Sequence, residues 1–187
     1  MKNEYKTLED VARNLYINVF WTHKIHEKQA EIYDCFYGWL KGINIFFAAL
    51  TSAGVIALIF EDPMGLKVAS AACAFVTTAL SAFLASFDFK AMATSNKTSA
   101  VKLVGLRNEL LVILAKIQFQ KQDIAVLMQE YESIQKRVHE VYELASKTTK
   151  HAVKKADFSI NKNKDGIYTD AEIDALLPDS LKRGSAN

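Results

Sequence analysis

The sequence predicts an all-α membrane protein, with a two-span transmembrane hairpin followed by a cytosolic helical segment. The main observation is that residues 42–60 form a run of 19 residues without a charged side chain, and residues 68–87 a run of 20. At about 1.5 Å per residue, each run can cross the roughly 30 Å hydrocarbon core of a bilayer as a helix. In addition, the chain of 187 residues has only 2 prolines and 7 glycines, which favours long helices over a turn-rich β fold.

The alternative to two spans is a soluble bundle in which these runs form buried central helices. The second run is rich in Ala, Ser and Thr, so its free energy of membrane insertion is marginal. A helix at the surface of a soluble core, however, carries charged side chains on its outer face. Neither run has any, and we therefore expect two membrane spans.

Residues 1–41 predict an N-terminal amphipathic helix that lies in the cytosol and at the membrane interface. Thr7 can cap this helix with its side-chain oxygen. Apolar residues then follow at the spacing of one helix face: Leu8, Val11, Ala12, Leu15, Tyr16 and Val19. Four aromatic residues precede the first span: Tyr33, Phe36, Tyr37 and Trp39. They indicate either an aromatic belt at the bilayer interface or ordinary packing onto a neighbouring helix.

Residues 61–67 connect the spans and contain a proline and a glycine, which predicts a tight external loop. Both ends of the chain then lie on one side of the membrane. Basic residues mark the cytoplasmic side, and the loop holds only Lys67. Seven basic residues flank the two spans: Lys24, Lys28, Lys41, Lys90, Lys97, Lys102 and Arg107. This asymmetry predicts that both termini are cytoplasmic.

Residues 88–149 contain the most regular pattern of the chain, a heptad repeat with one polar layer at Gln120. Its positions are Leu103, Leu106, Leu110, Ile113, Ile117, Gln120, Ile124, Leu127, Tyr131, Ile134, Val138, Val141 and Ala145. One interpretation is a continuous coiled coil of about 60 Å. The other is a helical hairpin that folds back at residues 118–123, with Asp123 capping the second helix. Either form needs a partner surface, in this chain or in a second copy.

Residues 150–187 predict a small C-terminal appendage. Within it, residues 161–172 match an EF-hand calcium loop at five positions: Asn161, Asn163, Asp165, Gly166 and Glu172. Two lysines and the lack of a second loop weigh against calcium. The competing interpretation is a β-hairpin in which Phe158–Ile160 pairs with Ile167 and Tyr168 across an Asp165–Gly166 turn.

Motifs of catalysis are absent from the sequence. The chain has no glycine-rich phosphate loop and no nucleophile elbow, so we expect no enzymatic activity, no catalytic residues, no cofactor and no metal. His23 and His26 could share a helix face and hold a metal, but two solvated histidines are the simpler interpretation. The net charge of +2 gives no reason to expect direct nucleic-acid binding.

The spans themselves carry two sets of candidate functional residues. Small side chains recur every four residues and allow close packing of helices: Ala49, Ala53 and Ala57 on the first span, and Ser70, Ala74, Thr78 and Ala82 on the second. Polar side chains are unfavourable toward lipid and suit a pore lining: Asn44, Thr51, Ser52, Thr77 and Ser81. Two spans cannot enclose a pore, so conduction requires a homo-oligomer.

This layout resembles the SLATT domains, the two-span effectors of bacterial conflict systems. The resemblance covers residues 8–148 and depends on three groups of residues: Trp21, Lys24 and Ala30 before the hairpin, Thr51-Ser52 within it, and Leu106-Arg107 after it. It implies a helical hairpin after the membrane, which favours the break near Gln120. The tail from Lys150 lies outside the pattern.

The resemblance also implies a function. SLATT proteins are regarded as antiphage effectors that form pores in the bacterial inner membrane and stop infected cells. A chain without a sensor domain is then expected to depend on a separately encoded partner, such as a sensor, a nucleotidyltransferase or a reverse transcriptase. The alternative function is a non-conducting membrane anchor or adaptor whose coiled coil scaffolds another protein.

Overall fold

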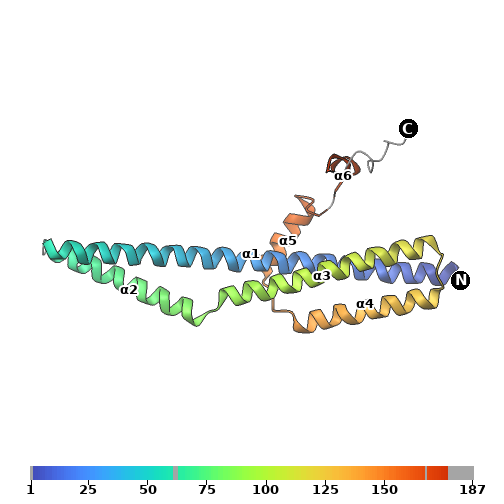
Figure 1. The fold of residues 1–187 in the computed structure, drawn as a ribbon, viewed down its shortest axis with the longest axis horizontal. Coiled ribbons are helices and arrows are strands. Elements are labelled where there is room, and N and C mark those ends of the chain that lie inside the picture. Colours follow the sequence, from blue (N-terminus) through green and yellow to red (C-terminus); the bar gives the residue numbers. More distant parts are fainter. Residues whose placement is uncertain (1, 61–62, 167, 177–187) are drawn as a thin grey trace.

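The computed structural model describes residues 2–60, 63–166 and 168–176, and every regular element in these ranges is a helix (Figure 1). The helices are α1 (Lys2–Phe60), α2 (Met64–Ser86), α3 (Phe89–Phe119), α4 (Ile124–Leu144), α5 (Lys150–Asn161) and α6 (Asp170–Leu176). Helices α1 and α2 form an antiparallel hairpin, and α3 and α4 pack beside the N-terminal half of α1 to form a bundle.

Helix α1 is continuous for 59 residues and is therefore about 90 Å long. It begins at Lys2, so the prediction that Thr7 caps it is wrong. The Thr7 hydroxyl instead donates to the Asn3 carbonyl, 3.0 Å away, within the helix. The amphipathic part of α1 continues into the first charge-free run without a break, so one rigid helix joins the bundle to the hairpin.

The connection between α1 and α2 is shorter than the sequence suggested. Helix α2 begins at Met64, directly after the extended Pro63, which suits a helix start because proline has no N–H to leave unpaired. Residues 64–67 are therefore helical, although the sequence predicted a loop over residues 61–67. Residues 61 and 62 lie outside the described part of the chain.

The chain changes direction at Phe87 and Asp88, where α2 ends and α3 begins. Phe87 is extended, and the Asp88 carboxylate caps α3 by accepting a 2.8 Å hydrogen bond from the Ala91 N–H. After this bend, helix α3 continues beside α1 toward the N-terminal end of α1.

The heptad segment is a helical hairpin, so the interpretation as one continuous coiled coil is wrong. Gln120 adopts a left-handed conformation with φ of 49° and ends α3, and the Asp123 carboxylate caps α4 through the Ala125 N–H at 2.8 Å. The apolar heptad positions turn inward and form the core with α1. Its buried members are Leu8, Ala12, Val19, Leu103, Leu106, Leu110, Ile113, Ile117, Leu127, Tyr131, Ile134 and Val138.

The C-terminal segment begins with α5, which projects from the side of the bundle (Figure 1). Its first turn is capped by Thr149, whose hydroxyl accepts from the Ala152 N–H at 3.2 Å. Residues 158–160 belong to this helix, so the predicted β-hairpin is wrong. Its partner residue Ile167 lies outside the described residues.

Candidate functional site

The two charge-free runs are almost entirely on the surface of the structure. The most apolar 18-residue windows, one in α1 and one in the segment Met64–Phe119, are 0% and 6% buried. A central helix of a soluble bundle is mostly buried, so the soluble-bundle alternative does not describe this fold. Large apolar side chains such as Ile59 and Phe60 are 75% and 82% exposed. These two helices are long and apolar enough to cross a membrane, which indicates a membrane protein.

The hairpin helices approach most closely at Gly54 and Ser70. A Cβ atom at position 54 would overlap the Ser70 hydroxyl and lie 3.2 Å from the Ser70 Cβ. Ser70 is 7% exposed, and its hydroxyl has no hydrogen-bond partner among the described residues. The absence of a side chain at Gly54 therefore sets the spacing of the hairpin.

Four of the five candidate pore-lining residues lie along the contact between α1 and α2. We refer to Asn44, Thr51, Thr77 and Ser81 as the polar seam. The Asn44 amide donates to the Ser81 hydroxyl at 3.1 Å, and Ser81 is exposed at the edge of the seam. Asn44, Thr51 and Thr77 are half-buried there.

Four hydroxyls of the hairpin find their acceptors locally. Thr51, Ser52, Thr77 and Thr78 each donate to the carbonyl four residues earlier, at 2.9 to 3.1 Å. This bonding lowers the cost of placing these four hydroxyls in a bilayer, because each of their donors has an acceptor, unlike that of the buried Ser70. Ser52, the fifth candidate, is exposed.

The small residues that were expected to pack helices fall into two groups. Ser70 is buried and Ala74 half-buried in the contact between α1 and α2. The others are exposed: Ala49, Ala53, Ala57, Thr78 and Ala82. These exposed residues are accessible to a neighbouring chain or to lipid.

Phe89 is the centre of an aromatic cluster where the hairpin meets the bundle. Its ring lies 5.2 Å from Phe36 and 6.5 Å from Tyr33 of α1, and 5.8 Å from each of Phe83 and Phe87. Phe89 is only 8% exposed. We call these five residues the aromatic joint.

Two of the five residues of the aromatic joint were identified from the sequence. Tyr33 and Phe36 pack onto a neighbouring helix, as one of the two interpretations proposed, whereas Trp39 is 70% exposed, as a belt residue would be. Phe83, Phe87 and Phe89 were missed. The Phe-Asp-Phe sequence that ends the second span was the available signal, since Asp88 is a helix cap placed between two aromatic rings.

A buried polar contact between α1 and α3 lies next to the aromatic joint, on the side of the bundle. His26 is 4% exposed and its Nδ1 lies 2.8 Å from Oδ1 of Asn96, which is fully buried. The interpretation of His23 and His26 as solvated histidines is therefore wrong for His26. Burial lowers the pKa of His23, with the nearby Glu27 carboxylate opposing this shift, and desolvation disfavours the charged imidazolium.

Helix α5 is held on α1 at both of its ends. At its N-terminus the fully buried Gln29 accepts from the Thr149 N–H at 2.7 Å and from the Thr149 hydroxyl at 2.9 Å. Beyond its C-terminus Asp165 accepts from the buried Lys24 ammonium at 3.0 Å and from the Ser159 hydroxyl at 2.7 Å. These contacts lower the pKa of Asp165, the Ser159 bond most strongly.

The segment that resembles a calcium loop has a helix–loop–helix form, with Gly166 at φ of 80°. Two of its three carboxylates, those of Asp165 and Glu172, bind other groups. Asp165 binds Lys24 and Ser159, and Glu172 accepts from the Thr169 N–H at 2.7 Å, which caps α6. This backbone hydrogen bond lowers the pKa of Glu172. In this arrangement the carboxylates attach the tail to α1 and stabilise α6.

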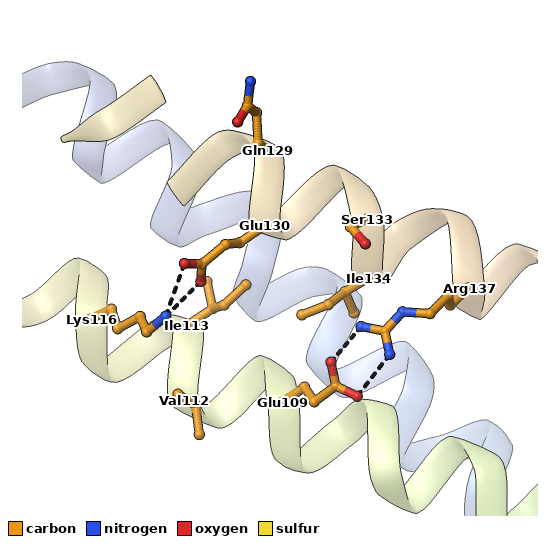
Figure 2. Close-up of a pocket in the computed structure, with 9 residues that line it drawn as sticks. All are labelled: Glu109, Val112, Ile113, Lys116, Gln129, Glu130, Ser133, Ile134 and Arg137. Atoms are coloured by element: carbon orange, nitrogen blue, oxygen red, sulfur yellow. Dashed lines mark hydrogen bonds and ion pairs between the residues drawn. The ribbon is translucent and has the colours of Figure 1, made fainter. Parts of the chain in front are cut away.

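A groove between α3 and α4 is bordered by two ion pairs (Figure 2). Lys116 donates to both Glu130 oxygens at 2.9 and 2.7 Å, and Arg137 forms a two-pronged pair with Glu109. The Arg137 hydrogen bonds lower the pKa of Glu109. Both pairs join α3 to α4 across the hairpin, so they help to fix its register.

We expect Arg137→Gln to reduce the free energy of unfolding by less than about 1 kcal/mol, because the pair is partly exposed. Since the pKa of Glu109 is lowered in the folded state, its contribution is present above the unfolded pKa and is lost as the pH falls through the folded pKa. Urea unfolding of both proteins in detergent should therefore differ at pH 7 and converge in acid.

Arg13→Gln is the control, because Arg13 pairs at 3.5 Å with Glu9 on an exposed face of α1 alone. A difference between parent and Arg137→Gln that persists at pH 2, or an equal loss in Arg13→Gln, would contradict the prediction.

Taken together, these features define a small all-helical protein in which one long helix connects a membrane-type hairpin to a helical bundle. The chain belongs to the SMODS and SLOG-associating 2TM effector domain family 4 (SLATT_4), whose family model matches residues 8–172. No curated protein and no solved structure gave a significant match.

The family match confirms the resemblance and corrects its extent. The resemblance was placed on residues 8–148, with the tail outside, whereas the family model extends through α5 and into α6. Helix α5 is thus part of the domain, consistent with its two polar attachments to α1. The family comprises two-span effector domains associated with conflict systems and, by its name, with SMODS and SLOG proteins, and no catalytic domain is identified.

Proposed function

We propose that this protein is an antiphage effector that assembles into a homo-oligomer and permeabilises the bacterial inner membrane when a separate partner or ligand triggers it. The observation that carries the proposal is the polar seam: a hairpin whose apolar surface suits lipid also carries an amide and three hydroxyls along one helix contact. A membrane anchor has no need of polar groups aligned along one helix contact, whereas a pore requires polar side chains toward its centre.

One hairpin cannot enclose an aqueous path, so the conducting form is built from several chains. The exposed residues Ala49, Ala53 and Ala57 of α1 allow the helix of another chain to approach closely. If the chains pack through this small-residue face, the exposed edge of the polar seam, at Ser81, can turn toward the centre of the oligomer.

The polar seam is confined to the half of the hairpin nearer the bundle. In the other half, the polar side chains of residues 55–60 of α1 and 64–70 of α2 are Lys67 and the buried Ser70, and the rest are apolar. Apolar constrictions close a pore by excluding water. A resting assembly is therefore closed, and the trigger must separate these apolar ends.

The bundle is well placed to receive the trigger. Helix α1 is shared by bundle and hairpin, and the aromatic joint links α1 to the bend between α2 and α3. A partner that binds one arrangement of the bundle better than another shifts the population of hairpin arrangements with it. In this proposal both termini are cytoplasmic, where a sensor, a nucleotidyltransferase or a reverse transcriptase can reach the bundle.

The test is membrane potential, measured with a voltage-sensitive dye in bacteria that express the chain, with Thr77→Leu as the variant and Thr78→Leu as its control. Thr77 lies in the polar seam and Thr78 on an exposed face, and both hydroxyls donate to the preceding turn at 2.9 Å. We expect depolarisation by the parent and by Thr78→Leu, and its loss in Thr77→Leu at equal amounts of membrane-inserted protein.

Equal depolarisation by both leucine variants would contradict the assignment of the polar seam as the lining. If no form depolarises cells even after phage infection, the adaptor function replaces the pore. In that case residues 42–87 can be exchanged for unrelated spans without loss of protection.

A further inference from the structure

Positive charge is concentrated in the segment that carries α5. Residues 147–165 contain six lysines and only two aspartates, although the whole chain has a net charge of only +2. Asp165 is already bonded to Lys24, and Asp157 accepts from the Asn161 side chain at 2.7 Å. The lysines of α5 therefore have no carboxylate partner among the described residues.

Part of this charge lines a hollow between α1 and α5. The hollow has a volume of about 430 Å³, and its lining includes Lys28, His151, Lys154, Lys155 and Phe158, together with the carboxylates of Glu31 and Asp165. This volume is within the roughly 300–1,000 Å³ range of small-molecule sites. Both carboxylates are already paired, Glu31 with Lys28 at 2.8 Å and Asp165 with Lys24 at 3.0 Å, so Lys154 and Lys155 supply the unpaired positive charge. Phe158, 58% exposed, adds an apolar wall.

The hollow exists because α5 is docked. The bonds of Gln29 to Thr149 and of Lys24 to Asp165 hold the two ends of α5 against α1, and Ala152 and Ala156 are fully buried between them. The backbone of Lys154 and Lys155 is thereby held on the outer side of a helix whose opposite face is packed. Lysines on a docked helix lose less backbone freedom on binding an anion than lysines on a mobile tail.

Membrane lipids are too distant to be the natural ligand. Lys28 precedes the charge-free run at Gly42 by 14 residues, or about 20 Å along α1. Charges in solution are screened over about 8 Å at physiological ionic strength. A lysine side chain does not span the remaining gap, so the ligand must come from solution.

We propose that the hollow between α1 and α5 binds a small soluble ligand that carries phosphate groups, with Lys154 and Lys155 as its principal contacts. Phosphate fits this site because it is compact and multiply charged, and lysine binds it as a point charge without strict geometry. The proposal concerns binding alone and is independent of whether the hairpin conducts ions.

The test is calorimetric titration of the full chain in non-ionic detergent with inorganic tripolyphosphate. We expect saturable binding by the parent and an affinity about tenfold lower for the double variant Lys154→Gln/Lys155→Gln, which corresponds to a loss of about 1.4 kcal/mol. The control is Lys150→Gln/Lys162→Gln, which removes the same charge from the same segment but from outside the hollow. We expect it to bind within about twofold of the parent.

The charge-preserving double variant Lys154→Arg/Lys155→Arg should keep binding, and unchanged thermal melting by circular dichroism should show that α5 remains folded. Absence of saturable binding by the parent overturns the proposal. An equal loss in both glutamine variants overturns it as well, because the attraction is then diffuse. So does binding seen only with phosphatidylglycerol nanodiscs and not with tripolyphosphate, because the ligand is then a lipid headgroup.

Discussion

Replacing Gly54 with leucine is expected to separate the two helices of the hairpin. Any side chain at this position overlaps the Ser70 hydroxyl and presses on the Ser70 Cβ, which lies 3.2 Å from the position of the new Cβ. Overpacking of this kind typically costs about 1–3 kcal/mol, and a leucine on a closely packed helix contact should reach the upper part of this range. The Asn44–Ser81 hydrogen bond should break as the helices move apart.

The separation can be measured by oxidative cross-linking of Asn44→Cys and Ser81→Cys, whose parent side chains are 3.1 Å apart, in a Cys35→Ser, Cys73→Ala background. We expect the intramolecular cross-link to form readily in isolated membranes and to decrease severalfold when Gly54→Leu is added. Gly54→Leu alone, in the chain without the cysteine substitutions, should also abolish the depolarisation of cells.

Gly42→Leu is the matched control, since Gly42 is on the same helix and a Cβ there meets nothing within 4 Å. The smaller change Gly54→Ala should be improved by Ser70→Ala, which removes the overlapping hydroxyl. Equal cross-linking in Gly54→Leu and Gly42→Leu would show that the hairpin is not packed as described.

Truncating Phe89 to alanine is expected to produce the largest loss of stability of any single change discussed. Phe89 is 8% exposed and contacts four other rings. Phe→Ala substitutions at buried sites cost about 3–5 kcal/mol, because apolar contacts are lost and a cavity remains. Aromatic pairing adds to this loss. The bend between α2 and α3 should then be free to move relative to α1.

The measurement combines urea unfolding of the detergent-solubilised protein, followed by circular dichroism, with the membrane-potential assay. We expect Phe89→Ala to unfold at lower urea concentration and to lose triggered depolarisation while it still inserts, and Phe89→Leu to recover much of both.

Phe119→Ala is the control, because Phe119 ends α3 and is 71% exposed, so its loss should stay within about 0.5 kcal/mol. A Phe89→Ala protein as stable as Phe119→Ala would contradict the aromatic joint as a structural centre. If Phe89→Ala has normal stability but no longer depolarises cells, the role of Phe89 is instead to couple the bundle to the hairpin.

The main elements of the fold could be predicted from the sequence because their signals are local. Absence of charge over 19 and 20 residues identifies two apolar helices regardless of what surrounds them. The heptad pattern likewise identified Leu103, Leu110, Ile117, Leu127 and Val138 as inward-facing, and the structure buries all five. Helix ends were less predictable: Asp123 caps a helix as expected, but Thr7 does not.

The candidate site was less predictable, because it depends on how each helix is rotated toward its neighbour. The small residues and the polar residues of the spans were both visible in the sequence. Which of them face the partner helix was decided by the close contact of Gly54 with Ser70, which turns Thr77 into the hairpin and Thr78 out of it.

The sequence by itself determined an all-helical protein with two apolar membrane-type helices and an apolar heptad segment, since these properties follow from composition and period along the chain. Only the tertiary structure decided the aromatic joint around Phe89 and the docking of α5 through Gln29 and Lys24. The contacts that α1 makes in both places join residues separated by 53 to 141 positions, as Phe36 to Phe89 and Lys24 to Asp165 illustrate. No local pattern encodes such pairs, because each partner is an ordinary helix residue until packing brings the two together.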